Sequence, residues 1–176
     1  TGYHAIGTNV TTLCVSAASN AVDVDTWVNP VATAGSNSPR NHGQTVELYG
    51  GPGGMSSYVW SGPDSFSSTD QNPTITGATP AATGTYTLTV TDGNGCTDTE
   101  TTDVIVYGSD LYVNDNSTAN DRWSGAVGDN NNPGTAALPL LTIGKAMSVA
   151  IDGDIIWVDA GGYTENVTVG KDVTLN

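Results

Sequence analysis

Oxygen-bearing side chains crowd the stretch of sequence between residues 110 and 132. Asp110, Asp115, Asp121 and Asp129 are interspersed there with several asparagines. Ca²⁺ takes about six to eight oxygen ligands in a flexible geometry, so these residue types suit a Ca²⁺ site. Their spacing matches neither an EF-hand loop nor a nonapeptide Ca²⁺ repeat. The same residues also suit a long solvated loop with Asx turns, which is the interpretation we favour, and the sequence leaves both open.

Two pairs of carboxylates further along the chain are candidates for acid–base chemistry. Asp152 and Asp154 flank Gly153, and Asp159 and Glu165 lie close to the next predicted turn. A glycosidase or lyase needs two such groups at a set separation, or Ca²⁺ with a base. We expect simpler roles: Asp152 ends a predicted helix, and Asp154 begins a strand and faces solvent.

The sequence contains no other catalytic arrangement. His4 and His42 lie apart in predicted loops, the pattern Gly-x-Ser-x-Gly is absent, and no Cys/His spacing fits zinc. We therefore predict that this chain is not an enzyme. We also predict no cofactor other than the Ca²⁺ considered above.

Composition excludes several classes of protein. The 176 residues include 18 acidic and 4 basic side chains, which gives a formal net charge of −14. Such a chain lacks the positive surface that binds nucleic acid. It contains neither an apolar run of about 18 residues nor a signal-peptide pattern, so we predict no membrane span. Scarce lysine and abundant Thr, Asn and Gly are typical of exported β proteins, so we expect an extracellular, cell-surface location.

The predicted elements are mostly strands and turns, which indicates an all-β protein, and they divide the chain into three segments. Residues 1–30 are too few to bury a core, so we expect the tail of a preceding domain or an added strand. In residues 31–107, short strands recur every ~8–12 residues, as in a β-sandwich. These strands are predicted at 44–49, 57–61, 73–76, 85–91 and 101–107. The third segment is 108–176.

Four residues of the second segment are predicted to build its core. Residues 85–91 alternate strictly between apolar and threonine side chains, so Tyr86 and Leu88 should face inward. Trp60 lies in the strand where immunoglobulin-like folds place a core aromatic, and Tyr86 begins its strand as in a tyrosine corner. Leu48 and Leu88 stand near the positions where antibody domains carry their cysteine pair. We predict structural roles for all four.

The third segment mixes strands with one short helix. A strand at 111–114 precedes a long loop over 115–139. Apolar residues recur at helical spacing over 142–150, which predicts a one-sided helix. Further strands are predicted at 154–159, 163–169 and 172–175.

Several motifs of the second segment resemble a known repeat. They are Gly51-Pro-Gly-Gly-Met55, Tyr58-Val-Trp-Ser-Gly-Pro63, Gly84-Thr-Tyr-Thr-Leu-Thr-Val-Thr-Asp92 and Asn94-Gly-Cys-Thr97. This string is similar to the Ig-like, PKD-like repeats of large bacterial surface adhesins, best known from gliding bacteria with type IX secretion. The resemblance implies a stalk or spacer without catalytic residues.

The cysteines depart from that family. The repeat commonly has a cysteine shortly after Asn-Ser-Pro, which pairs with the cysteine of Asn-Gly-Cys. Here that place reads Arg40-Asn-His42, so Cys96 lacks its usual partner. Cys14 and Cys96 both flank predicted strands, and export would permit a disulfide between them. The sequence leaves this pairing open.

The third segment also resembles a family pattern. The motifs are Tyr112-Val-Asn114, Gly153-Asp-Ile-Ile-Trp-Val158 and Ala160-Gly-Gly-Tyr-Thr-Glu-Asn-Val167. They look like the N-terminal cap and first coil of a right-handed parallel β-helix of the pectate-lyase-like type. The resemblance implies that the helix closes the apolar end of the solenoid. It also implies further coils, because a single coil cannot bury its own face.

We therefore predict a structural and adhesive module of a large secreted surface protein or extracellular filament. Its expected partners are neighbouring domains of the same long chain, neighbouring subunits, or glycan. Two alternatives stay open: an accessory part of a secreted polysaccharide lyase or hydrolase, and a self-assembling fibre subunit that uses strand addition.

Overall fold

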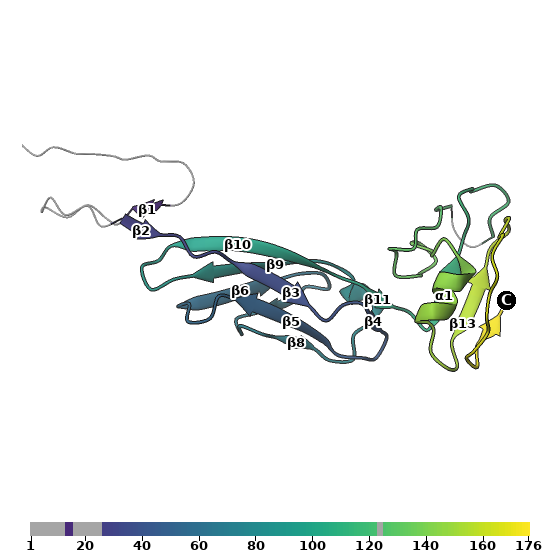
Figure 1. Cartoon of the computed structure of the whole chain (residues 1–176), viewed down its shortest axis with the longest axis horizontal. Coiled ribbons are helices and arrows are strands. Elements are labelled where there is room, and N and C mark those ends of the chain that lie inside the picture. The colour runs from purple at the N-terminus through teal and green to yellow at the C-terminus, as the bar shows by residue number, and fades with distance from the viewer. Residues whose placement is uncertain (1–12, 16–25, 123–124) are drawn as a thin grey trace, which may run out of the picture.

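The structure, a computed structural model, describes residues 13–15, 26–122 and 125–176, with side chains from Val28 onward. Figure 1 shows a long body of strands followed by a smaller body that carries helix α1. Most of the predicted segment 1–30 lies outside the described residues. Its described part consists of strands β1 (Leu13–Val15) and β2 (Thr26–Val28), which pair antiparallel.

Two antiparallel sheets form the long body. One has the strand order β10-β9-β6-β7 and the other β3-β5-β8. Their bounds are β3 (Thr33–Ser36), β5 (Val46–Gly51), β6 (Ser57–Ser61), β7 (Ser67–Ser68), β8 (Thr74–Ile75), β9 (Gly84–Thr91) and β10 (Thr97–Val104). A short parallel ladder joins β4 (Arg40–Asn41) to β11 (Val106–Tyr107), and a 3-10 turn, η1, spans Pro80–Ala82. Two packed antiparallel sheets are the architecture of Ig-like sandwiches, so the all-β fold expected for this segment is confirmed.

Alternation along the strands builds the core of the sandwich. Tyr86, Leu88 and Val90 of β9 are fully buried, and the threonines between them are only partly covered. From the other sheet, Val46 and Leu48 of β5 are buried and alternate with exposed neighbours. Successive side chains of a strand point to opposite faces, so one apolar set from each sheet meets in the middle.

The two large aromatic residues of this core satisfy their polar atoms with backbone carbonyls. Trp60 is buried, and its Nε1 donates to the carbonyl oxygen of Gln71 at 3.2 Å. The hydroxyl of Tyr86 donates to the carbonyl oxygen of Ala82 at 2.8 Å, four residues upstream, as a tyrosine corner does. Gly62 lies against the ring of Tyr86, and a Cβ there would overlap the ring, so the close approach requires glycine.

The smaller body is built on a parallel sheet. Its strands β12 (Asp110–Val113), β13 (Ile155–Val158) and β14 (Thr174–Leu175) are paired in that order. Leu111 lies beside Ile156, which in turn lies beside Leu175. Helix α1 (Ile143–Val149) adds Ala146 and Met147 to the core formed around Leu111 and Ile156.

Three predictions for strands and exposure are wrong in part. Residues 163–169 are all described and form no strand; they run as a loop whose Tyr163 and Val167 pack on the second core. The strand predicted at 101–107 begins earlier, at Thr97, and breaks into β10 and β11. Asp154 does not face solvent: it is buried, and its Oδ2 accepts a hydrogen bond from the N–H of Ile151 at 2.9 Å.

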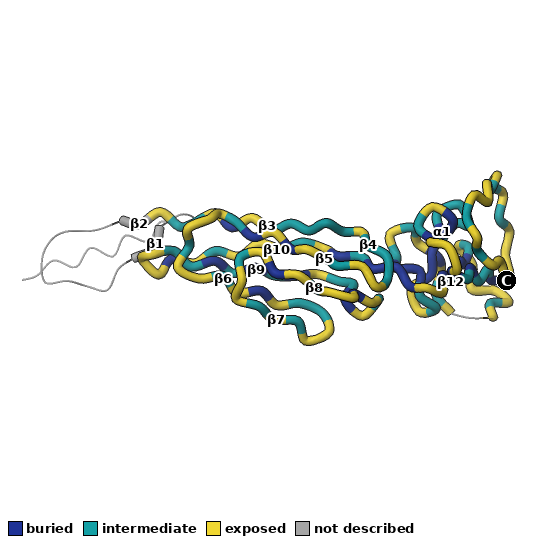
Figure 2. Tube along the Cα trace, turned by 90° about the horizontal axis from the view of Figure 1, so that it is seen from below, coloured by how far each residue is buried: buried dark blue, intermediate teal, exposed yellow. Residues whose placement is uncertain are grey.

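The two bodies meet end to end through several direct contacts. Only Gly108 and Ser109 separate β11 from β12. The side chain of Asn41 donates to the carbonyl oxygen of Val149 at 2.9 Å, and Nε2 of His42 lies 3.5 Å from Oδ1 of Asp154. Figure 2 shows that buried residues continue from the sandwich into the base of the second body. The junction is therefore packed rather than a bare linker.

Candidate functional site

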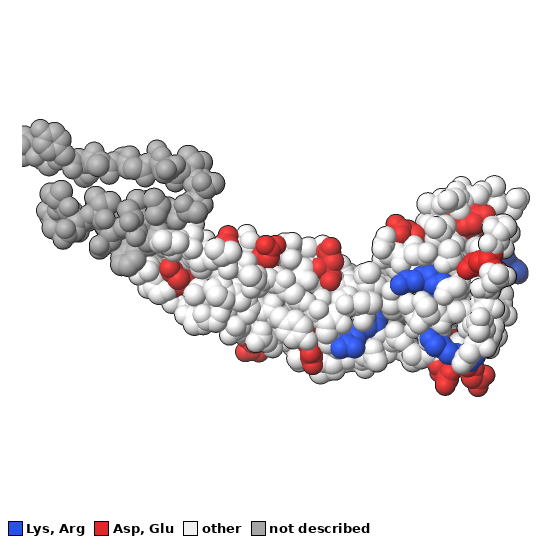
Figure 3. Space-filling model, in the orientation of Figure 1, with Lys and Arg blue, Asp and Glu red and all other residues white. Residues whose placement is uncertain are grey.

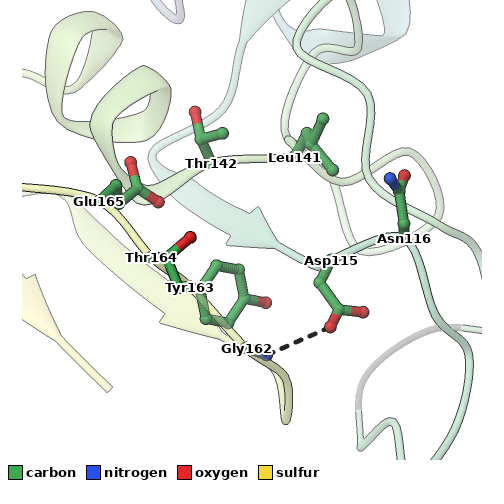
Figure 4. A pocket seen from close by; sticks show the side chains of 8 residues that line it. All are labelled: Asp115, Asn116, Leu141, Thr142, Gly162, Tyr163, Thr164 and Glu165. Atoms are coloured by element: carbon green, nitrogen blue, oxygen red, sulfur yellow. Dashed lines mark hydrogen bonds between the residues drawn. The ribbon is translucent and has the colours of Figure 1, made fainter.

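A cavity of about 290 Å³ opens beside the N-terminus of α1, beyond the end of β12 (Figure 4). It is lined by Asp115, Asn116, Leu141, Thr142, Gly162, Tyr163, Thr164 and Glu165. Figure 4 shows the two carboxylates on opposite sides of Tyr163. Its lining carries hydroxyl, amide and carboxylate groups from three stretches of chain.

Glu165 caps the N-terminus of helix α1. Its two carboxylate oxygens accept hydrogen bonds from the N–H groups of Ile143 at 2.8 Å and Gly144 at 2.7 Å. Thr142 completes the cap, because its Oγ1 accepts from the N–H of Lys145 at 3.1 Å. A carboxylate at a helix N-terminus satisfies free N–H groups and complements the helix dipole. The structure therefore gives Glu165 a capping role.

Asp115 is likewise engaged by the backbone. It accepts hydrogen bonds from the N–H of Ser117 at 2.7 Å and from the N–H of Gly162 at 3.3 Å. The dashed line in Figure 4 marks the second of these contacts. The first closes an Asx turn, and the second ties this turn to the loop that follows β13. Both carboxylates of the cavity thus organise the chain around it.

Tyr163 is held as a hydrogen-bond donor. Its hydroxyl lies 3.4 Å from the carbonyl oxygen of Val113 and 3.3 Å from that of Asp159. Burial, followed by the charges of Asp115, Asp159 and Asp121, raises the pKa of Tyr163 to about 12. The phenol therefore keeps its proton at neutral pH and cannot act as a base there.

The aspartates proposed for Ca²⁺ are not gathered at one point. Asp110 begins β12, and Asp115 follows the opposite end of that strand. Asp129 accepts a hydrogen bond from the N–H of Asn131 at 2.9 Å, which is an Asx turn. Among the described residues, no group of three His, Cys, Asp or Glu side chains could hold a metal ion. The solvated loop with Asx turns accounts for Asp129 and for one oxygen of Asp115.

The remaining carboxylate candidates also bind backbone. Asp152 accepts a hydrogen bond from the N–H of Asp172 at 3.0 Å. Asp159 is buried, and its Oδ1 accepts from the N–H groups of Arg122 at 2.7 Å and Ala160 at 2.8 Å. The sequence points to Asp159 only as half of a carboxylate pair, and to Asn114, which is also buried, only as one of the oxygen-bearing residues between 110 and 132. Asn114 directly follows β12 and Asp159 directly follows β13, and the ends of neighbouring parallel strands lie close together. This position after a strand is the sequence signal that could have brought the two residues into one site.

The predicted disulfide falls partly outside the described side chains. Cys96 is buried, in the turn that Asp92 closes by accepting from the Cys96 N–H at 2.8 Å. The backbone of Cys14 lies in β1, and its side chain is outside the described residues. The pairing of Cys14 with Cys96 stays a prediction.

Comparison with known proteins finds similarity over part of the chain. No family model and no curated protein matches it. The PKD1 domain of the metalloprotease PrtV from Vibrio cholerae is 31% identical, over 44% of this chain and 98% of that domain, with a TM-score of 0.34. The PKD1 domain of Vibrio anguillarum Epp is also 31% identical, over 44% of this chain and 95% of that domain, with a TM-score of 0.35.

A third similar structure is the amphioxus IgVJ-C2 molecule. It is 22% identical, over 52% of this chain and 54% of that one, with a TM-score of 0.36. The sandwich described above has two packed antiparallel sheets, which is the architecture of Ig-like folds. In the described part of the chain, no helix has the length and apolar character needed to cross a membrane.

Proposed function

We propose that this chain is a structural, adhesive-type module of a large secreted surface protein. In this proposal the Ig-like sandwich acts as a spacer, and the smaller body begins a right-handed parallel β-helix that further coils extend towards a surface or a glycan. In this proposal the described residues have structural rather than catalytic roles. The single observation that carries the proposal is the packed, end-to-end junction between the two bodies.

The junction supports a spacer because it restricts bending. Contacts reach across it from β4, from the residue after β4 and from β11. Asn41 and His42 contact Val149 and Asp154 as described, and Nζ of Lys145 in α1 lies 5.4 Å from the ring centroid of Tyr107 in β11. Tyr107 is buried in the second core although β11 pairs with a strand of the sandwich. A shared core residue couples the orientation of one body to that of the other.

The parallel sheet supports a β-helix. Ile155 of β13 is paired with Thr174 of β14, 19 residues later, without an intervening helix. Stacked turns of about 20 residues or more are the unit of solenoid proteins. Two apolar side chains of this region are exposed, Leu175 of β14 at 48% and Val169 at 57%. A further coil would cover them and would pair with the outer edge of β14.

The surface supports an extracellular setting. Figure 3 shows isolated acidic groups over the sandwich, with the few basic groups near the junction and the second body. Export of acidic, lysine-poor β proteins is consistent with this pattern. A largely uncharged surface with hydroxyl side chains also offers trypsin-like proteases few sites.

Small-angle X-ray scattering of the full chain tests the spacer. We expect the scattering of one rigid, elongated particle. The double variant Asn41→Ala, Asp154→Ala removes two junction contacts and should broaden the distribution of distances between the bodies. The variant Glu100→Ala, at an exposed position of β10, is the matched control and should leave the profile unchanged. A wild-type profile that requires an ensemble of widely bent shapes would refute the proposal.

A further inference from the structure

A cluster of buried polar side chains lies where the parallel sheet ends. Asn114 directly follows β12 and Asp159 directly follows β13. The parallel pairing continues to them, since the N–H of Asp159 donates to the carbonyl oxygen of Val113 at 2.9 Å. Asn114 is 1% exposed and Asp159 5% exposed. Buried polar groups of this kind are expected to have partners for all of their strong acceptors.

One oxygen of Asn114 has no partner. Its Nδ2 donates to Oδ2 of Asp121 at 2.9 Å and to the carbonyl oxygen of Ala126 at 2.8 Å. Both partners are acceptors, so the orientation of the amide is fixed and Oδ1 is the atom left over. That Oδ1 is buried without a hydrogen-bond partner, and the same is true of Oδ1 of Asp121. Two unpartnered buried oxygens therefore belong to side chains that contact each other.

Negative charge exceeds positive charge around these oxygens. Asp121 and Asp159 line a cavity of about 320 Å³ together with Arg122. Two carboxylates and one guanidinium leave a formal charge of −1 around this cavity. An excess of negative charge around unpartnered oxygens favours a bound cation rather than a bound water.

We propose that this cluster binds Ca²⁺, with Oδ1 of Asn114 and Oδ1 of Asp121 as ligands and the carboxylate of Asp159 beside them. Mixed carboxylate and amide oxygens in a loop suit Ca²⁺, whereas Mg²⁺ requires a stricter octahedral geometry. The N–H groups of Arg122 and Ala160 orient the carboxylate of Asp159. Of the four aspartates considered from the sequence, this set keeps only Asp121. The ion would link the loop after β12 to the end of the sheet and stabilise that loop. This role is independent of the spacer proposal.

Metal addition to the full chain tests the site. Thermal melts followed by circular dichroism compare EDTA, about 1 mM CaCl₂ and about 1 mM MgCl₂ at matched ionic strength. We expect Ca²⁺ to raise the Tm and Mg²⁺ to have a much smaller effect. Tb³⁺ should also bind, with luminescence excited through Tyr163 or Trp157, and Ca²⁺ should displace it. No change in Tm together with no sensitised Tb³⁺ luminescence overturns the proposal, and water then fills these positions.

Two isosteric variants locate the ion. Asp121→Asn keeps an acceptor for Asn114 but removes the charge, and it should weaken Ca²⁺ binding by at least about tenfold. Asp129→Asn removes the same charge nearby, at a carboxylate that binds Asn131 instead, and should bind Ca²⁺ as wild type does. Equal weakening by both variants, or none by Asp121→Asn, refutes the assignment to this cluster. The Tb³⁺ titration of the wild type stays decisive if Asp121→Asn fails to fold.

Discussion

Trp60 offers the most direct test of how the sandwich is held together. The side chain is 0% exposed, its ring lies against Gly50, and its Nε1 donates to the carbonyl oxygen of Gln71 at 3.2 Å. Replacing it with alanine removes the buried ring, leaves a cavity between the sheets and leaves that carbonyl unpaired. Large-to-small changes of a buried aromatic cost about 3–5 kcal/mol, and the lost hydrogen bond adds about 1 kcal/mol.

That loss is a large part of the stability of a small domain, which is typically about 5–15 kcal/mol. Guanidinium denaturation of the full chain, followed by far-UV circular dichroism, should therefore show the sandwich unfolding at a much lower denaturant concentration in Trp60→Ala. Val59 is the matched control: it precedes Trp60 in β6 but is 47% exposed, so Val59→Ala should cost no more than about 1 kcal/mol. Similar midpoints for Trp60→Ala and Val59→Ala would refute the reasoning, because burial would then not decide the cost.

Three further predictions concern the second body and the cysteines. The pKa of Tyr163 is raised to about 12, above the ~10 of an unfolded tyrosine, so its contribution to the free energy of unfolding is constant below pH 10 and is lost as the pH rises towards 12. Tyr163→Phe should reduce that alkaline loss in urea melts at several pH values, and an unchanged pH dependence contradicts the assignment. Glu165→Ala leaves two helix N–H groups without acceptors and should destabilise α1 by about 1–2 kcal/mol, seen as faster amide exchange there, whereas Glu165→Gln should lose less. Thiol titration in denaturant without reductant should find no free thiol if Cys14 pairs with Cys96, and two free thiols per chain would exclude that disulfide.

Much of the sandwich follows from local pattern alone. The strict alternation of β9 identifies both its span and its inward face, because a strand has a period of two and Thr tolerates solvent. Strand β6 has the predicted bounds for the same reason, with turn residues on either side. The boundary between β10 and β11 was missed, because β11 leaves the sheet of β10 to pair with β4, far away in sequence.

The second body shows where local pattern fails. Residues 163–169 alternate as a strand does, but Glu165 is needed at the N-terminus of α1, so this stretch runs as a loop and the sheet resumes at β14. Asp154 was expected to face solvent at the start of its strand, but one of its carboxylate oxygens accepts the N–H of Ile151, three residues earlier. Its neighbour His42 is supplied by the other body. Asn114 and Asp121 both lie in the stretch considered for Ca²⁺, but the sequence does not connect Asp159 with them, because the parallel pairing of β12 with β13 brings Asp159 there.

The β4–β11 ladder has a mechanical consequence. The described chain enters the sandwich at one end and leaves it for the second body at the other (Figure 1). Tension along this axis pulls β3 and the start of the sandwich one way and β11 the other. Two hydrogen bonds join β4 to β11: the N–H of Arg40 donates to the carbonyl of Ile105 (3.0 Å), and the N–H of His42 donates to that of Tyr107 (2.8 Å). Both bonds are then perpendicular to the direction of the force. We expect them to be loaded in shear and to yield together, so that the sandwich resists extension most strongly along its own length.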